Sequence, residues 1–248
     1  KTAIKAVESG CHVFIEKPLS TSSQGLKKLQ KLSKEKNKII QVGFMLRYHP
    51  NLIFIKNVLK NKLIGDIFYC RALVGQSIKD WRPNTNFKMS YSLDMKRGGG
   101  VIFDLCHEFD YLSWILGKFK NIYAFNQKIN FISDDVESIS HVVFKTENNI
   151  SGTITLDYVR PFLERSFEVV GSKGVIRWSE LDGKVKTSYD GKVWTVINEV
   201  NHEFTRNSMY YLEIKNFIKN ISEKKSCISG NLDQGIEILK VCLISHSS

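Results

Sequence analysis

The chain has 248 residues, of which 42% are hydrophobic, and a formal net charge of +11 at pH 7. This length exceeds that of a typical single domain, and the composition is that of a folded globular protein. No apolar stretch approaches the ~20 residues needed to span a bilayer, and the first residues do not resemble a signal peptide. We therefore expect a soluble protein that does not associate with a membrane.

The distribution of cysteines and lysines argues against disulfide-rich, zinc-binding and nucleic-acid-binding proteins. The five cysteines are odd in number and widely scattered, without a CxxC pair, which argues against a disulfide scaffold and against structural zinc. We expect no metal, and a reducing cytoplasm as the location. The lysines are spread over several segments and no nucleic-acid-reading module is present, so we expect no nucleic-acid partner.

The first segments alternate between helix and strand. Lys1–Ser9 has helical spacing, and Cys11–Ile15 and Ile39–Phe44 are predicted to be buried strands. Ser20 or Thr21 is expected to cap the helix between these two strands. Short connections in this order are typical of a doubly wound parallel sheet.

The rest of the chain predicts a different architecture. Arg47–Asn61 is expected to be a helix with Pro50 in its first turn, and two more helices are predicted at Arg206–Ile221 and Leu232–Ser245. Between them, eight segments have strand-like patterns separated by turn residues, which favours a largely antiparallel open sheet: Ile67–Val74, Ile122–Phe131, Ser138–Thr146, Ile150–Val159, Arg165–Gly171, Gly174–Trp178, Lys184–Ser188 and Lys192–Ile197.

Three consecutive glycines open the most informative segment. Gly98–Gly100 precede an apolar run of helical period that carries Asp104, His107 and Asp110. Glycines allow the backbone to approach a ligand closely, and steps of three place these side chains on one face of a helix. An imidazole between two carboxylates suits a site that moves protons. Alternatively, the segment is a helix start with a buried histidine.

A second motif, Glu16-Lys17-Pro18, ends the first predicted strand. The carboxyl ends of parallel strands are where ligands bind in open α/β sheets. A lysine there can hold a hydroxyl group and lower the pKa of a nearby base. Without the flanking Glu16 and Pro18, a solvated lysine at the end of a strand would be the better interpretation of Lys17.

Together these motifs resemble the glucose–fructose oxidoreductase/inositol dehydrogenase family (Gfo/Idh/MocA) of nicotinamide-dependent oxidoreductases. The resemblance follows the family's order along most of the chain. It rests on Ser9–Leu19, Val42-Gly43-Phe44 with Arg47 and Pro50, Ile64-Gly65-Asp66, Asp80-Trp81-Arg82-Pro83, the glycine–histidine segment and Gly171–Gly174.

The resemblance implies the fold class and the domains. We expect residues 1–46 to be the C-terminal part of a Rossmann-type parallel-sheet domain, and residues 47–248 to be an α+β domain with a large, mainly antiparallel open sheet. The glycine-rich phosphate turn of a Rossmann domain is missing, since Gly10 is isolated and precedes a strand. We therefore expect a fragment that starts inside the cofactor domain and binds dinucleotide poorly by itself.

The resemblance also implies a function. We expect NAD- or NADP-dependent hydride transfer to or from a sugar, polyol or nucleotide-sugar, in a homodimer or homotetramer formed through the sheet. His107 would be the acid/base, Lys17 would position the substrate hydroxyl and Asp104 would assist. The family usually separates the Asp and the His by four residues, whereas here they are three apart.

Further residues are expected around this centre. The cofactor side would include Glu16, Lys17, Pro18, Arg47, Trp81 and Arg82, and the substrate side Lys17, Asp104, His107, Tyr48 and Tyr210. Two alternatives on the same fold remain open. One is a non-catalytic NAD(P)- or sugar-binding regulatory protein, and the other is a lyase or glycosidase that recycles its NAD.

Overall fold

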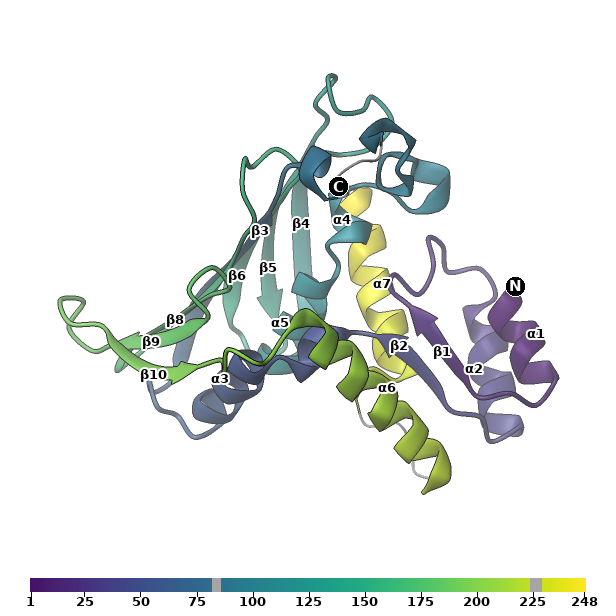
Figure 1. Cartoon of the computed structure of the whole chain (residues 1–248), viewed down its shortest axis with the longest axis horizontal. Coiled ribbons are helices and arrows are strands. Elements are labelled where there is room, and N and C mark those ends of the chain that lie inside the picture. The colour runs from purple at the N-terminus through teal and green to yellow at the C-terminus, as the bar shows by residue number, and fades with distance from the viewer. Residues whose placement is uncertain (82–85, 224–228) are drawn as a thin grey trace.

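The computed structural model describes residues 1–81, 86–223 and 229–248. A small parallel sheet with two helices lies at one end, and a large sheet forms the other (Figure 1). The last helix, α7 (Leu232–His246), runs between the two sheets and packs on strands of both. The C-terminal segment therefore holds the two parts together.

The small sheet is formed by β1 (Val13–Glu16) and β2 (Ile40–Gly43), which pair in parallel. Helices α1 (Thr2–Glu8) and α2 (Leu26–Glu35) accompany them, as the alternation in the sequence predicted. All four residues of β2 are buried. A continuous apolar run of this kind is typical of a parallel strand covered on both faces.

Two predicted helix starts are wrong. Helix α2 begins at Leu26, and its N-cap is Gly25 and not Ser20 or Thr21. Gly25 has a φ of +79°, which is outside the helical region. The helix expected from Arg47 begins at Pro50, because a 3₁₀ turn, η1 (Met45–Tyr48), precedes it.

The capping residue of this helix, α3 (Pro50–Lys60), is His49. Its Nδ1 accepts the N–H of Asn51 at 3.2 Å. Burial first, and then the charge of Arg165, lowers the pKa of His49 to about 4. The ring is therefore neutral and free to accept this hydrogen bond at neutral pH.

The large sheet has the strand order β10-β9-β8-β7-β3-β6-β5-β4. Of these described strands, β3 and β6 pair in parallel and all other neighbours are antiparallel. This confirms the predicted, mainly antiparallel open sheet. The strands are β3 (Ile67–Gly75), β4 (Phe119–Gln127), β5 (Ile139–Thr146), β6 (Ser151–Asp157), β7 (Glu164–Gly171), β8 (Gly174–Ser179), β9 (Lys184–Ser188) and β10 (Thr195–Glu199).

One face of this sheet is covered and the other is open. Helices α3, α5 and α7 contact the covered face, where Ile154, Val169 and Trp178 are fully buried. The strands alternate accordingly, most regularly in β5. Helix α6 (Arg206–Ser222) lies on the small sheet instead, where Phe217 packs edge-on against Phe14.

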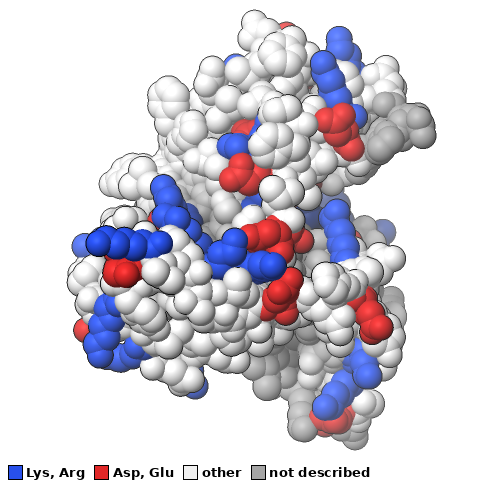
Figure 2. Space-filling model, turned by 60° about the vertical axis from the view of Figure 1, so that its left-hand side comes forward, with Lys and Arg blue, Asp and Glu red and all other residues white. Residues whose placement is uncertain are grey.

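The net positive charge does not form one broad field on the face that Figure 2 shows. Basic and acidic side chains lie next to each other there. Several exposed side chains of the described residues form ion pairs. Examples are Lys62 with Asp66 at 3.0 Å and Lys186 with Asp182 at 2.6 Å.

The segment predicted as one helix is two helices. Helix α4 (Val101–Asp104) ends before α5 (His107–Leu116) begins. In a continuous helix the carbonyl of Asp104 would accept the N–H of Glu108, but that N–H bonds Leu105 O at 3.2 Å. Lys17 takes the freed carbonyl, so Asp104 and His107 do not share one helical face.

The three glycines approach the protein's own chain. A Cβ on Gly99 would lie 2.5 Å from Ser92 O, and a Cβ on Gly100 would lie 2.3 Å from Glu137 Oε1. The Glu137 carboxylate accepts the N–H of Ile102 at 3.1 Å and so caps α4. These glycines therefore shape the start of α4, which corrects the expectation of a ligand loop.

We expect Gly100→Ala to lower the free energy of unfolding by about 3 kcal/mol or more. Its φ of +98° and ψ of +150° belong to a region that essentially only glycine adopts, and the new Cβ would also meet Glu137. Gly191→Ala is the control, because Gly191 has a φ of +75° but nothing within 4 Å. Gly191→Ala should lower the free energy of unfolding by about 1 kcal/mol. Urea unfolding checks both values, and equal losses would contradict the packing argument.

Candidate active site

Lys17 leaves the carboxyl end of β1 and reaches the end of α4. Its Nζ lies 2.5 Å from the backbone oxygen of Asp104 and 3.3 Å from Asp104 Oδ1. The Lys17–Pro18 peptide bond is cis. Two segments 87 residues apart in the sequence therefore meet at this ion pair.

Asp104 is the centre of the site. Its side chain is buried, with the residue 3% exposed. Besides Lys17, three hydroxyl groups donate to its carboxylate: Ser92 Oγ at 2.6 Å, Tyr91 OH at 3.0 Å and Tyr158 OH at 3.1 Å. A buried carboxylate is stable only when it is paired and hydrogen-bonded in this way.

These contacts determine the charge of Lys17. Burial alone would lower its pKa, but the acidic groups of Cys106, Asp104 and Tyr91 outweigh that effect and raise it. Lys17 therefore remains a cation, and Asp104 holds its ammonium group in place. An ammonium group has three donors, of which Asp104 occupies two.

His107 opens helix α5 beside this pair and is 7% exposed. Burial, and then the charges of Lys17, Arg165 and Arg206, lower its pKa well below the usual value. The imidazole is thus neutral at pH 7. Its Nδ1 is buried and has no hydrogen-bond partner among the described residues. A neutral imidazole can accept a proton at a ring nitrogen.

Two buried ion pairs fix the helix that carries His107. Glu108 Oε1 accepts from Arg165 Nε at 2.7 Å on one side. On the other, Asp110 accepts from Arg47 Nε at 2.9 Å and from Arg47 Nη2 at 2.6 Å. Two-point pairing of this kind is geometrically specific. The contacts of Asp110 therefore support a role in holding helix α5 in place.

Arg47 belongs to the framework of buried ion pairs that holds helix α5 in place. Its side chain is buried, and its remaining nitrogen, Nη1, donates to Gln234 of α7 at 2.7 Å. The contact of Arg47 with the cofactor stays a prediction. In the structure Arg47 connects η1, α5 and α7.

The other expected residues differ in how far their side chains are exposed. Glu16 is exposed at the end of β1, and Pro18 follows Lys17. Trp81 is half-buried and stands edge-on to Tyr158, with ring centroids 5.2 Å apart. Tyr48 is half-buried and Tyr210 is exposed on α6. Arg82 lies outside the described residues.

Sequence reasoning missed the hydroxyl donors around Asp104. Tyr91 and Ser92 lie in a run of 3₁₀ turns, and Tyr158 directly follows β6. No motif singles them out, because their common partner is distant in the sequence. Among the described residues no group of three or more potential metal ligands occurs, and no helix is long and apolar enough to cross a membrane.

Two family models cover most of the chain. Residues 1–44 match "Oxidoreductase family, NAD-binding Rossmann fold", and residues 53–177 match the "GFO/IDH/MocA C-terminal domain". The chain belongs to the Gfo/Idh/MocA family. This confirms the resemblance that the two motifs carried.

Named relatives of this family member include polyol dehydrogenases. An inositol 2-dehydrogenase/D-chiro-inositol 3-dehydrogenase of Lacticaseibacillus casei is 34% identical over 117 residues, which are 46% of this chain and 30% of that enzyme. The scyllo-inositol 2-dehydrogenase (NAD(+)) of Bacillus subtilis is 25% identical over 95% of this chain and 68% of its own length. A 2,7-anhydro-N-acetylneuraminate hydratase of Mediterraneibacter gnavus is 25% identical over 46% of this chain and 29% of its own length.

Solved structures share the fold. A levoglucosan dehydrogenase in complex with NADH matches with a TM-score of 0.83 at 18% identity, over 99% of this chain and 74% of that structure. An inositol dehydrogenase homologue from Azotobacter vinelandii, in complex with NADH and myo-inositol, matches with a TM-score of 0.79 at 14% identity, over 99% and 72%.

We expect Asp110→Asn to destabilise the protein by about 3–5 kcal/mol, because it leaves the buried Arg47 without its charge partner. Asp66→Asn is the control, since Asp66 pairs with Lys62 in solvent. It should cost about 1 kcal/mol or less. Chemical denaturation measures both. A loss for Asp110→Asn no larger than that of the control would refute the framework role.

Proposed function

We propose that this chain provides the catalytic and substrate-binding side of an NAD- or NADP-dependent dehydrogenase that acts on a secondary alcohol of a sugar, polyol or nucleotide-sugar. One observation carries the proposal: a neutral imidazole, His107, is buried beside a cation, Lys17, that Asp104 holds at the carboxyl end of a parallel strand. Residues 1–46 would contribute the cofactor side and residues 47–248 the substrate side and the oligomer contacts.

The residues at this edge fit a nicotinamide cofactor. The family model that matches residues 1–44 describes an NAD-binding Rossmann fold. The carboxyl ends of β1 and β2 form the edge where open α/β sheets bind ligands. His107 Nδ1 is a buried polar atom with no partner among the described residues. Glu16, Lys17 and Pro18 would contact the nicotinamide end. When bound, the nicotinamide accepts or gives the hydride.

The protein's own part is proton transfer and positioning. In the oxidation, the Lys17 ammonium donates its remaining hydrogen bond to the alcohol oxygen, and His107 removes the hydroxyl proton at a ring nitrogen. The alcohol carbon loses its hydride and becomes a carbonyl, so one proton and one hydride leave the substrate. The low pKa of His107 keeps the base unprotonated before the reaction.

The lyase alternative also has support, because one relative is named a hydratase. The two functions differ in net cofactor turnover. A dehydrogenase accumulates NADH or NADPH in proportion to oxidised substrate, whereas an enzyme that recycles its NAD does not.

For either enzyme we propose a reducing cytoplasm as the location, which fits the free thiols of Cys11, Cys70, Cys106 and Cys242.

We expect His107→Ala to lower kcat by roughly 10²–10⁴ in the full-length protein, because general base catalysis is lost. His202→Ala is the control, since that histidine is exposed in the turn before α6. Reduced-nucleotide absorbance with inositols and levoglucosan as trial substrates gives the rates. Equal rates for both variants would show that His107 is structural.

The pH profile offers a second check on His107. Its pKa is lowered, so the base stays unprotonated down to a pH well below the usual 6.5 of histidine. We expect kcat/KM to stay level from about pH 6.5 to 8 and to fall only at lower pH. An acid limb centred at or above pH 6.5 would contradict the assignment.

We also propose that two copies associate through the open face of the large sheet. One row across this face follows from the strand registers: Tyr123, Val143, Thr153, Arg71, Glu168, Arg177 and Lys186. Its β4–β5 end is apolar, with Tyr123 and the nearby Phe125 each 71% exposed.

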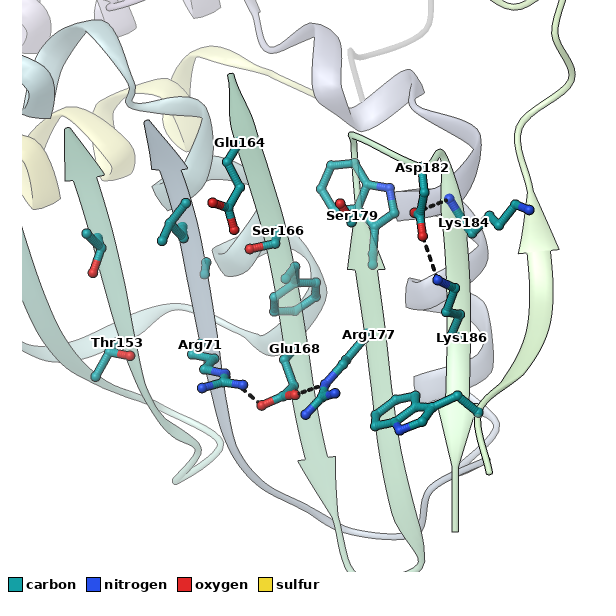
Figure 3. Close-up of a pocket in the computed structure, with 16 residues that line it drawn as sticks. Arg71, Thr153, Glu164, Ser166, Glu168, Arg177, Ser179, Asp182, Lys184 and Lys186 are labelled. Carbon is teal, nitrogen blue, oxygen red and sulfur yellow. Dashed lines mark hydrogen bonds and ion pairs between the residues drawn. The ribbon is translucent and has the colours of Figure 1, made fainter. Parts of the chain in front are cut away.

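The other end of the row is polar and hollowed. Figure 3 shows Arg71 and Arg177 turned toward Glu168 between them, within a hollow of about 840 Å³ that Trp194 also lines. Arg71 Nε lies 2.7 Å from Glu168 Oε1. A face with an aromatic part and a charged part suits a copy of itself, because symmetric dimers pair one patch with the same patch.

We expect Tyr123→Lys combined with Phe125→Lys to convert an oligomer to monomers, since it places two charges in the apolar part of the interface. Leu181→Lys is the control, because Leu181 is similarly exposed in the turn between β8 and β9. Analytical ultracentrifugation measures the mass. A wild-type monomer at high concentration, or an unchanged oligomer in the double variant, would contradict the proposal.

A further inference from the structure

Helix α7 begins at a hydrogen-bonded cap that attaches it to the small sheet. Asn231 is the N-cap, and its side chain accepts the N–H of Gln234 at 2.9 Å. Gly230, directly before the cap, accepts the N–H of Val42 of β2 at its carbonyl oxygen, at 2.7 Å. A Cβ on Gly230 would lie 2.8 Å from Val42 O, so only glycine permits this approach. The start of α7 is therefore fixed to the end of β2.

The side-chain oxygen of Gln234 accepts from three donors. They are the backbone N–H of Gly230 at 2.8 Å, the backbone N–H of Asn231 at 3.2 Å and Arg47 Nη1 at 2.7 Å. Because all three partners are donors, the amide oxygen of Gln234 must face them, and not the amide nitrogen. One atom thus closes the cap of α7 and holds a buried cation.

Arg47 contacts both the helix and the ring surroundings of His107. Its Nε and Nη2 donate to Asp110, which follows His107 by three residues in α5. Its guanidinium carbon lies 5.5 Å from the centroid of the Phe44 ring. That ring stands edge-on to the His107 imidazole, with centroids 6.4 Å apart. Phe44 and Arg47 are 2% and 5% exposed, so neither can move without displacing its neighbours.

Gln234 fixes the position of this arginine relative to the small sheet. The two-point pair with Asp110 sets Arg47 relative to α5, but the pair could still move as a unit. Arg165 of β7 holds α5 to the large sheet through Glu108. On the other side, the contact of Arg47 with Gln234 holds α5 to the start of α7 and, through Gly230, to β2.

We propose that Gln234 is a positioning residue for the reaction, which places His107 correctly relative to Lys17 and the cofactor edge of the small sheet. The proposal rests on the proposed dehydrogenase function. Gln234 acts through Arg47 and touches neither substrate nor cofactor. Its loss therefore slows proton transfer at His107 and leaves nucleotide binding nearly unchanged.

The first test compares Gln234→Met with the wild type in the full-length protein. Methionine has a similar length but no amide oxygen, so Arg47 and the cap lose their acceptor. We expect kcat per nucleotide-binding site to fall roughly tenfold or more, because small displacements of a catalytic group are costly. The Kd for NADH or NADPH should stay within about twofold. Fluorescence titration counts the binding sites, so unfolded protein does not enter kcat.

Two variants serve as rescue and control. Gln234→Glu keeps an oxygen acceptor for all three donors, so its kcat should lie within about threefold of the wild type. Gln30→Met removes a glutamine that bonds Asp233 in the same turn of α7, at 2.7 Å, without taking part in the contacts of Arg47. This control should keep the wild-type kcat.

A double variant shows whether Gln234 acts through His107. Once the imidazole is absent, its placement no longer matters, so Gln234→Met combined with His107→Ala should be at most about twofold slower than His107→Ala alone. A merely structural role would slow both backgrounds by the same factor. Effects that multiply therefore overturn the proposal.

The remaining outcomes also decide the matter. A wild-type kcat in Gln234→Met, a Gln234→Glu variant as slow as Gln234→Met, or a Gln234→Met variant that does not fold overturns the positioning role. A wild type that oxidises none of the inositols or levoglucosan with either nucleotide refutes the dehydrogenase function instead. Wild-type turnover together with one of the first three results refutes only the role of Gln234.

Discussion

The carboxylate of Asp104 is the contact on which the site depends. It brings together Lys17 from the small sheet, Tyr91 and Ser92 from the turns before the glycines, and Tyr158 from the end of β6. A carboxylate buried this deeply is tolerated only with such a complete set of donors. The same residue's backbone carbonyl is freed where α4 ends and accepts from Lys17, and His107 begins α5 three residues later.

Buried charges elsewhere in the site are neutralised locally. Arg165 is paired with Glu108 and Arg47 with Asp110, so the helix carrying His107 is held from both sides. Burial, and then the charges of Lys17, Arg165 and Arg206, lower the pKa of His107 and keep its imidazole neutral. A base that is unprotonated in the resting protein and a cation fixed beside it are what alcohol oxidation requires of a protein when a cofactor takes the hydride.

Most of the fold was predictable, because hydrophobic periodicity and turn residues specify elements locally. The strand pattern from Ile67 onward and the two late helices were predicted to within a few residues of each boundary. The break after Asp104 was not predicted, since the carbonyl that it frees has its partner in a lysine 87 residues away. Nor was the framework role of Arg47, since a sequence does not show which arginines become buried against a carboxylate.

A double-mutant cycle on Lys17 and Asp104 tests the role of this ion pair most directly. Lys17→Met, Asp104→Asn and the double variant are compared by their free energies of unfolding and, in the full-length protein, by turnover. We expect effects that are not additive, with a coupling energy of about 1–3 kcal/mol in stability and a double variant hardly slower than either single one. Effects that add to within about 0.5 kcal/mol in stability, and that multiply in turnover, would contradict it.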